Sequence, residues 1–136
     1  MSSQPFILAK PLECGLSLSL SLAPGADARK ALKRVAAGYD LRWGTLGVGE
    51  PLVRAAGATV PGLSTFAAMS APGVGVPSTQ QAMWTMLAGA TQGAIVATLQ
   101  KVKALLGADL VIADSMPTFL NASRDLTGYV DGTENP

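Results

Sequence analysis

The sequence of 136 residues contains no histidine and only one cysteine, Cys14. Without histidine, Ser-His-Asp and Cys-His catalytic sites cannot form, and the usual zinc ligand sets are incomplete. A single cysteine excludes an intramolecular disulfide and is compatible with a reducing compartment. Because no histidine or other obvious base can activate Cys14, we expect it to be a small buried apolar residue and not a nucleophile.

Charged residues are also scarce, at 14%, and the 10 basic residues nearly balance the 9 acidic ones. Non-specific nucleic-acid binding depends on many lysine and arginine contacts to phosphate, so we expect no nucleic-acid partner. The apolar share of 49% predicts a folded domain of ordinary size. The first residues, MSSQPFILAKPLE, lack a basic stretch followed by a long apolar run, which predicts a cytoplasmic protein.

No charged side chain occurs between Ala55 and Gln100, and Gly89 and Gly93 have the GxxxG spacing of membrane helices. A bilayer would leave the amide groups of several glutamines in this region without hydrogen-bond partners. We therefore expect this region to form a soluble interior or an interface, and no membrane association. The glutamines are Gln80, Gln81, Gln92 and Gln100.

Several segments have clear periodicity. Residues 14–22, CGLSLSLSL, alternate leucine with serine, which predicts a strand with one buried face. Residues 26–38 have helical spacing, and we expect their basic residues, Arg29, Lys30, Lys33 and Arg34, to form the solvated side. A second strand is predicted within 39–49, a short helix within 49–57, and a loop rich in proline and glycine over 59–77.

The stretch 80–107 permits two interpretations. It has the periodicity of one long helix, but the apolar run 82–88 suits a buried strand about as well, with a helix after it. A last strand is predicted within 109–121, since Pro117 cannot lie inside a helix. The strand option gives a ferredoxin-like βαββαβ domain of the α+β class, with one antiparallel sheet and helices on one face. We expect another sheet to pack on the other face, and Trp43 and Trp84 to lie in the core or an interface.

The polar segment 124–136, RDLTGYVDGTENP, is rich in residues that form turns. It closely resembles the signature of the dye-decolourising peroxidases, whose GxxDG motif matches residues 128–132, Gly-Tyr-Val-Asp-Gly. The segments SLAPGAD, PLVRAAGATVPGL and APGVGVPSTQ also resemble the bacterial cytoplasmic branch of that family. The resemblance covers nearly the entire chain.

The resemblance implies a fold and a catalytic residue. Members of the family contain two ferredoxin-like domains whose sheets face one another, so residues 1–136 match the N-terminal domain and 124–136 form a motif loop leading to a second domain. Asp131 matches the distal acid, which would take a proton from hydrogen peroxide and return it to the departing oxygen. Gly128 and Gly132 would let the backbone approach a porphyrin, and the same loop would orient Asp131 or contact a propionate through Thr133, Glu134 and Asn135.

The same resemblance implies that haem b is bound only when a complementary C-terminal half supplies the proximal histidine and a distal arginine. Iron ligation by Cys14, Tyr39, Tyr129 or a methionine is not expected, because none matches a position that the family uses. The complete enzyme would oxidise dyes or phenolic compounds with peroxide, whereas this chain alone would be inactive. The alternative is a haem-free, non-catalytic α+β binding module that dimerises through its exposed sheet. In either case we expect a homo-oligomer.

Overall fold

The structure, a computed structural model, describes residues 3–122, 124–125 and 127–130. Its central strand is β1 (Cys14–Leu22), in which leucines and serines alternate. β1 pairs antiparallel with β5 (Met83–Gly89) on one side and with β6 (Leu110–Phe119) on the other. β5 pairs in turn with β2 (Gly44–Val48). The order β2-β5-β1-β6 with antiparallel neighbours is that of the ferredoxin-like fold, which confirms the predicted class.

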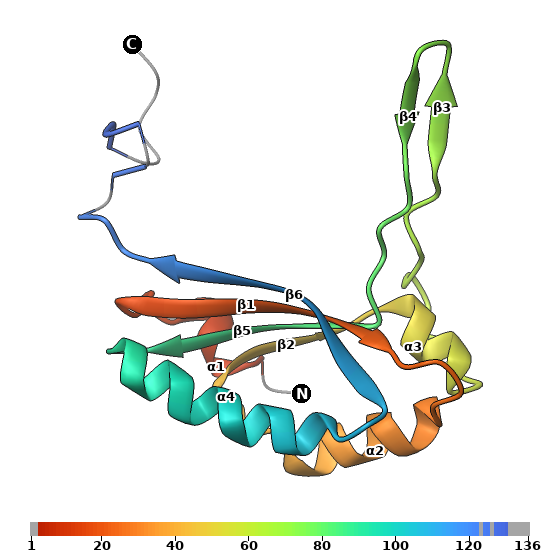
Figure 1. Cartoon of the computed structure of the whole chain (residues 1–136), viewed down its shortest axis with the longest axis horizontal. Helices are drawn as coiled ribbons and strands as arrows, with labels where there is room; N and C mark the ends of the chain where they lie inside the picture. Colours follow the sequence, from red (N-terminus) through yellow and green to blue (C-terminus); the bar gives the residue numbers. More distant parts are fainter. Residues whose placement is uncertain (1–2, 123, 126, 131–136) are drawn as a thin grey trace.

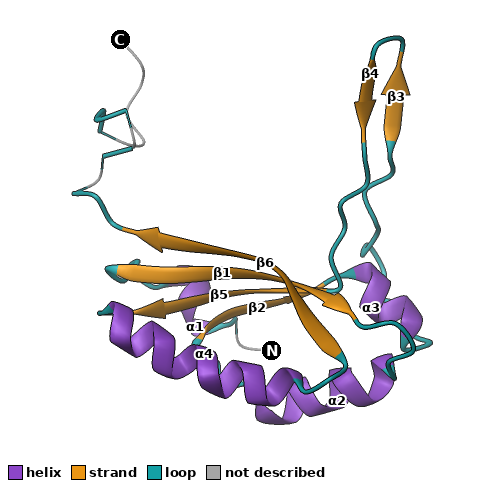
Figure 2. Ribbon diagram, in the orientation of Figure 1, coloured by secondary structure: helices purple, strands orange, loops and turns teal. Residues whose placement is uncertain are grey.

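Two longer helices, α2 (Ala28–Gly38) and α4 (Gln92–Leu106), cover one face of this sheet (Figures 1 and 2). Both begin at side-chain caps: the Asp27 carboxylate accepts from the Lys30 N–H at 3.0 Å, and the Thr91 hydroxyl accepts from the Ala94 N–H at 3.2 Å. The region 80–107 is therefore a strand followed by a helix, and the single long helix is excluded.

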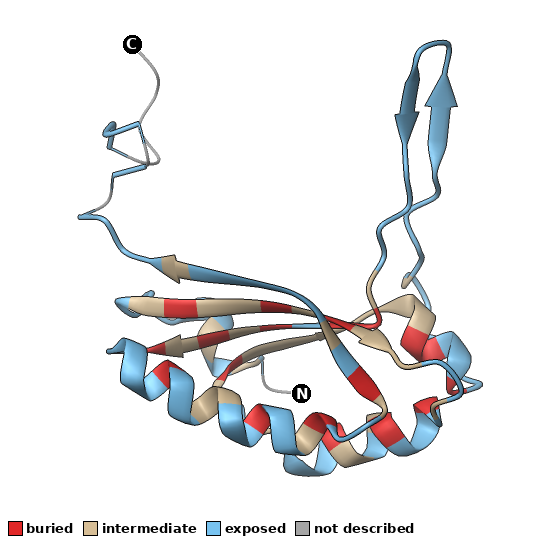
Figure 3. Ribbon diagram, viewed as in Figure 1, coloured by how far each residue is buried: buried red, intermediate tan, exposed pale blue. Residues whose placement is uncertain are grey.

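The core lies between the sheet and these helices (Figure 3). Leu18 and Leu87 on the central strands are fully buried, and Val35 and Val102 come from α2 and α4. Because side chains alternate across a strand, these leucines share one face while the serines of β1 lie on the other. That other face, away from α2 and α4, is called the open face below. Its side chains include Ser17, Ser19, Trp84, Met86, Val111, Met116 and Thr118.

Three shorter elements complete the described chain. α1 (Pro5–Leu8), which the sequence did not predict, lies beside β2. α3 (Glu50–Ala55) lies within the predicted range 49–57 and has Glu50 and Pro51 in its first turn. The predicted loop over 59–77 is wrong in part, because it contains a hairpin of β3 (Met69–Ala71) and β4 (Val74–Val76). None of the helices within the described ranges combines the length and apolar character needed to cross a bilayer.

The prediction of a solvated basic side on α2 is confirmed for Arg29, Lys30 and Lys33, which are exposed, and is wrong in part for Arg34, which is half-buried. The Arg34 guanidinium donates to the carbonyls of Leu105 at 2.7 Å and Leu106 at 2.5 Å, and pairs with Asp109 at 2.6 Å. Arg29 donates to the Ala56 carbonyl at 3.1 Å. These arginines satisfy the free carbonyls at the ends of α4 and α3, where a positive charge also complements the helix dipole.

Cys14 and the two tryptophans are buried to different extents. Cys14 at the start of β1 is half-buried and packs against the core, so the prediction of a small buried residue is confirmed in part. Trp43 packs against the core and meets Tyr39 edge-on, with ring centroids 5.4 Å apart. Trp84 is 38% exposed on the open face, where its indole N–H donates to the Ser17 hydroxyl at 2.9 Å. The predicted core position is thus confirmed for Trp43, whereas an interface at Trp84 stays a prediction.

Thr85 on β5 is a fully buried polar residue whose hydrogen bonds join two strands and a helix end. Its hydroxyl donates to the Thr45 carbonyl at 2.9 Å, so it accepts from the Tyr39 hydroxyl at 2.6 Å. Burial is the main reason that the pKa of Tyr39 is raised.

We expect Thr85→Val to lower the free energy of unfolding by about 1–3 kcal/mol, since it leaves the buried Tyr39 hydroxyl without a partner. Tyr39→Phe should cost less in the Thr85→Val background than in the wild type. Urea denaturation of the four proteins measures both effects. Thr98→Val, a half-buried site on α4, is the control and should change stability by less than about 0.5 kcal/mol. If the stability costs of Thr85→Val and Tyr39→Phe simply add in the double variant, the hydrogen bond between the two side chains would be contradicted.

Candidate functional site

The C-terminal loop, here residues 124–130, follows β6 and contains the start of the glycine motif. Arg124 and Val130 form an isolated antiparallel bridge, and the Asp125 N–H donates to the Tyr129 carbonyl at 2.9 Å. The Arg124 guanidinium donates to the Gly128 carbonyl at 2.8 Å. These contacts join Arg124 and Asp125 to residues 128–130 and close this part of the loop into a tight turn.

Gly128 lies at the tip of this turn with a φ of +92°, which other residues adopt only with strain. A Cβ atom at this position would meet no other atom within 4 Å. The glycine is therefore required by the backbone conformation and not by lack of space. Of the six site residues that the sequence predicts, Gly128 is the one within the described chain. The other five, Asp131, Gly132, Thr133, Glu134 and Asn135, lie outside the described residues, and their roles stay predictions.

Asp125 organises the loop through its carboxylate, which the sequence analysis did not single out. One oxygen accepts from the Thr127 hydroxyl at 2.6 Å and from the Thr127 N–H at 2.8 Å. The Thr127 hydroxyl is the main reason that the pKa of Asp125 is lowered, and backbone N–H groups add to it. The spacing Asp-x-Thr is typical of an Asx turn and could have indicated this arrangement.

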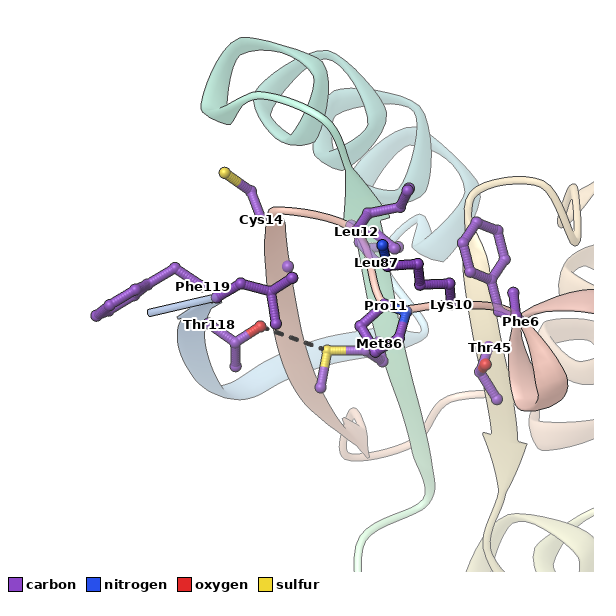
Figure 4. Close-up of a pocket in the computed structure, with 14 residues that line it drawn as sticks. Phe6, Lys10, Pro11, Leu12, Cys14, Thr45, Met86, Leu87, Thr118 and Phe119 are labelled. Carbon is purple, nitrogen blue, oxygen red and sulfur yellow. Dashed lines mark hydrogen bonds between the residues drawn. The ribbon is translucent and has the colours of Figure 1, made fainter. Parts of the chain in front are cut away.

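A cavity of about 290 Å³ is lined by residues at the ends of β1, β5 and β6 (Figure 4). The C-terminal loop leaves the sheet at this end of β6 (Figure 1). The walls of the cavity come from the N-terminal segment 6–12 and from the ends of β1, β2, β5 and β6. The lining residues are mostly apolar, with the Thr45 and Thr118 hydroxyls and the Lys10 amine as side-chain polar groups. They are Phe6, Ala9, Lys10, Pro11, Leu12, Cys14, Gly15, Thr45, Met86, Leu87, Ala88, Thr118, Phe119 and Leu120.

Two anchors hold the N-terminal segment over this cavity. The Gln4 amide pairs with the backbone of Leu46, donating to its carbonyl at 2.7 Å and accepting from its N–H at 2.8 Å. At the other end, the Leu120 N–H donates to the Glu13 carbonyl at 3.0 Å. Gln4 thus satisfies part of the free edge of β2, in the manner of a neighbouring strand. Such long-range anchoring leaves no local pattern, so the sequence analysis missed the cavity.

Among the described residues, the cavity and the two tyrosines offer few of the features of a haem site. The cavity is at the lower limit of pockets for drug-sized ligands, roughly 300–1,000 Å³, and its lining contains no imidazole. Tyr39 is engaged with Thr85, and Tyr129 is exposed on the C-terminal loop. Within the described part of the chain, no three or more cysteine and acidic side chains gather in a way that could hold a metal.

Comparisons with known proteins identify the fold. No family model matches the sequence, and no curated protein does. Among solved structures, the chain is similar to DypB from Rhodococcus jostii, with 25% identity and a TM-score of 0.74 over 100% of this chain and 50% of that one. A variant of the same protein in complex with haem gives 27% identity and a TM-score of 0.73, over 96% and 47% of the two chains.

A dye-decolourising peroxidase from Bacteroides thetaiotaomicron has a TM-score of 0.75 over 94% of this chain and 47% of that one. Its identity of 21% shows the fold alone. The chain spans about half the length of the solved structures that it matches. It thus resembles the N-terminal half of a dye-decolourising peroxidase, as the motif at 128–132 implied.

We expect Thr127→Val to raise the pKa of Asp125 toward the ordinary carboxyl value of about 3.9. The pKa of Asp125 is lowered in the folded loop, so its hydrogen bonds stabilise the loop at pH values above the ordinary carboxyl pKa. This stabilisation is lost as the pH falls through the lowered pKa. NMR titration of the side-chain carboxyl carbon measures the shift. The pKa of Asp40, lowered to about 2 by Arg42, is the internal control. An unchanged pKa of Asp125 in the variant would contradict the assignment to Thr127.

Proposed function

We propose that this chain is the N-terminal half of a haem peroxidase of the dye-decolourising type, which acts in the cytoplasm once a complementary half completes it. The observation that carries the proposal is the combination of a match to half of such peroxidases with the Gly-x-x-Asp-Gly motif at 128–132. The complete protein would use hydrogen peroxide to oxidise dyes or phenolic compounds.

Incomplete burial of the apolar side chains on the open face supports the proposal of a second half. Its apolar side chains are incompletely buried, with Trp84 at 38%, Val111 at 48% and Met116 at 59% exposure. A sheet with helices on one side and apolar groups on the other is normally covered by a further layer. Serine and threonine hydroxyls lie among these groups, together with the exposed Asp114, which pairs with Ser19. A second sheet would pack on this face at a spacing of about 10 Å.

In this proposal Asp131 moves protons. A carboxylate with a pKa near its ordinary value of about 3.9 is ionised at neutral pH and can accept a proton from hydrogen peroxide. An Asp131 oxygen then returns that proton to the departing oxygen atom, which makes it a better leaving group. Burial beneath a second half would raise the pKa of the carboxyl group and help it to give the proton back. The hydrogen-bonded turn at 124–130, which directly precedes Asp131, supports this role.

The remaining parts of the site would come from the complementary half. The sequence contains no histidine, so the proximal ligand of haem b has to be supplied by that half. Haem, when bound there, would supply the redox chemistry that no side chain provides. Residues 132–135, which adjoin Asp131, would contact the edge of the group. The N-terminal chain by itself would be inactive.

We expect the purified chain to show no Soret shift with haem alone, but a sharp Soret band and peroxide-dependent dye bleaching after mixing with a complementary half. The partner to test is a histidine-bearing ferredoxin-like protein encoded beside this chain. Absorbance spectroscopy measures both signals. A chain that captures haem and turns over peroxide alone would refute the division of the site, and failure to bind haem with or without the partner would favour a haem-free binding module.

In the reconstituted complex, Asp131→Asn should lower kcat/KM for hydrogen peroxide by about 10²- to 10⁴-fold, because the amide cannot accept the proton. Stopped-flow mixing with peroxide measures the rate. Glu13→Gln is the matched control, since Glu13 is exposed and its carboxylate makes no hydrogen bond or ion pair with the described residues. It should leave the rate unchanged. Unaltered peroxide kinetics in Asp131→Asn would remove this residue from the mechanism.

A further inference from the structure

Two hydroxyl groups that line the cavity beneath the N-terminal segment lack strong partners among the described residues. The Thr118 hydroxyl donates to the Met86 sulfur at 3.9 Å, and a thioether is a weak acceptor. The Thr45 hydroxyl makes no hydrogen bond with the described residues, since the Thr85 hydroxyl donates to the Thr45 carbonyl instead. Both threonines are half-buried. A molecule bound in the cavity would supply the partners that these two hydroxyls lack.

Gly15 on β1 keeps this end of the sheet hollow. A Cβ atom at position 15 would clash with the Thr118 hydroxyl and would lie 3.4 Å from the Met86 sulfur. Any larger residue would therefore fill the place where the side chains of Met86 and Thr118 meet. The glycine leaves that place to the cavity, of which all three residues form part of the lining.

Lys10 supplies a positive charge at the edge of the cavity. It is exposed, and its amine makes no ion pair or hydrogen bond with the described residues. Figure 4 shows its side chain extending from the N-terminal segment over the group of lining residues. Glu13, the acidic residue closest to it in the sequence, does not line the cavity. An unpaired amine beside a half-enclosed apolar space attracts an anion.

The other walls of the cavity are mostly aliphatic. Leu12 comes from the N-terminal segment, Leu87 from β5, and Leu120 from the residues after β6. Phe119 is 61% exposed, and its ring points away from the cavity (Figure 4). Each methylene group buried against such walls adds to affinity. The volume of about 290 Å³ suits a ligand smaller than a drug-sized molecule.

We propose that the cavity binds a medium-chain aliphatic monocarboxylate, such as octanoate. The Lys10 amine and the two threonine hydroxyls donate to its carboxylate, which can only accept hydrogen bonds, and the leucines bury its chain. No arginine lines the cavity, and one amine suits the single charge of a carboxylate better than a phosphate. This site is separate from the motif at 128–132 and goes beyond the proposed function.

Titration of octanoate into the haem-free chain, with isotope-labelled methionine methyl groups observed by NMR, tests the proposal. The Met86 methyl signal should shift and saturate with a Kd of about 0.1–1 mM, the affinity expected for a ligand of about ten non-hydrogen atoms. The signals of Met69 and Met116, which are exposed and do not line the cavity, should not move. Met86→Leu identifies the Met86 signal. 1-Octanol, which lacks the charge, should bind at least about fivefold more weakly.

Matched variants identify the group that holds the carboxylate. Lys10→Met should raise the Kd for octanoate by about tenfold, because it removes a hydrogen bond between charged groups, and should leave binding of 1-octanol unchanged. Lys10→Arg should retain octanoate binding. Thr118→Val, which removes one donor, should raise the Kd by about threefold. Lys33→Met removes the same charge from the exposed side of α2 and should have no effect.

A Met86 signal that does not saturate with octanoate, or an unchanged Kd in Lys10→Met, would overturn the proposal. An equal loss of affinity in Lys33→Met would overturn it as well, because binding would then follow the net charge of the chain. Benzoate, which has the carboxylate without an aliphatic chain, should bind at least about tenfold more weakly than octanoate. Equal affinity for both acids would contradict selection of an aliphatic chain. None of these measurements involves haem, peroxide or the complementary half, so the proposed function is tested separately.

Discussion

Burial of one face of the sheet beneath α2 and α4 is the interaction on which the rest of the structure depends. The leucines of β1 and β5 lie on that face and are removed from water by Val35 and Val102. At roughly 1.5–3 kcal/mol for each fully buried aliphatic side chain, this layer is the main favourable contribution to folding. It also determines where function can lie, because the elements that it does not cover remain available for other contacts.

Three uncovered features follow from this arrangement. The open face carries apolar and hydroxyl side chains that suit a second sheet. The β3–β4 hairpin extends away from the core, and its side chains are exposed (Figure 3). The C-terminal loop leaves the end of β6 beside the cavity beneath the N-terminal segment. The described domain thus packs as a layer of sheet and helices, whereas its proposed catalytic role requires a second half.

The C-terminal loop shows how local chemistry can prepare a site. Asp125 and Thr127 form a turn from neighbouring residues, and Gly128 supplies the backbone conformation at its tip. These interactions need no second half. In the proposed function, the proton transfer by Asp131 does need one, since its pKa and its position relative to peroxide depend on what covers the loop. In that proposal, the same segment combines a turn formed by local contacts with a site that the second half completes.

The sequence by itself determined those features that rest on neighbouring residues. The alternation in residues 14–22 predicted β1 with its observed bounds, the capped periodicity predicted α2, and the glycine motif indicated the peroxidase resemblance. Two alternatives for 80–107 stayed open, because a short apolar run suits a buried strand and a buried helix equally. The apolar run is a strand because it pairs with both β1 and β2, and this pairing exists only in the tertiary structure.

Tertiary structure alone decided the features that join distant parts of the chain. Arg34 donates to a carbonyl at the end of α4, more than sixty residues away. Gln4 accepts from the Leu46 N–H of β2, and the Thr85 hydroxyl accepts a hydrogen bond from the Tyr39 hydroxyl. The hairpin within 59–77 was hidden among prolines and glycines that predicted a loop. The physical reason is the same in each case: hydrogen bonds and burial between distant residues depend on how the chain folds back on itself, and local periodicity carries no record of that.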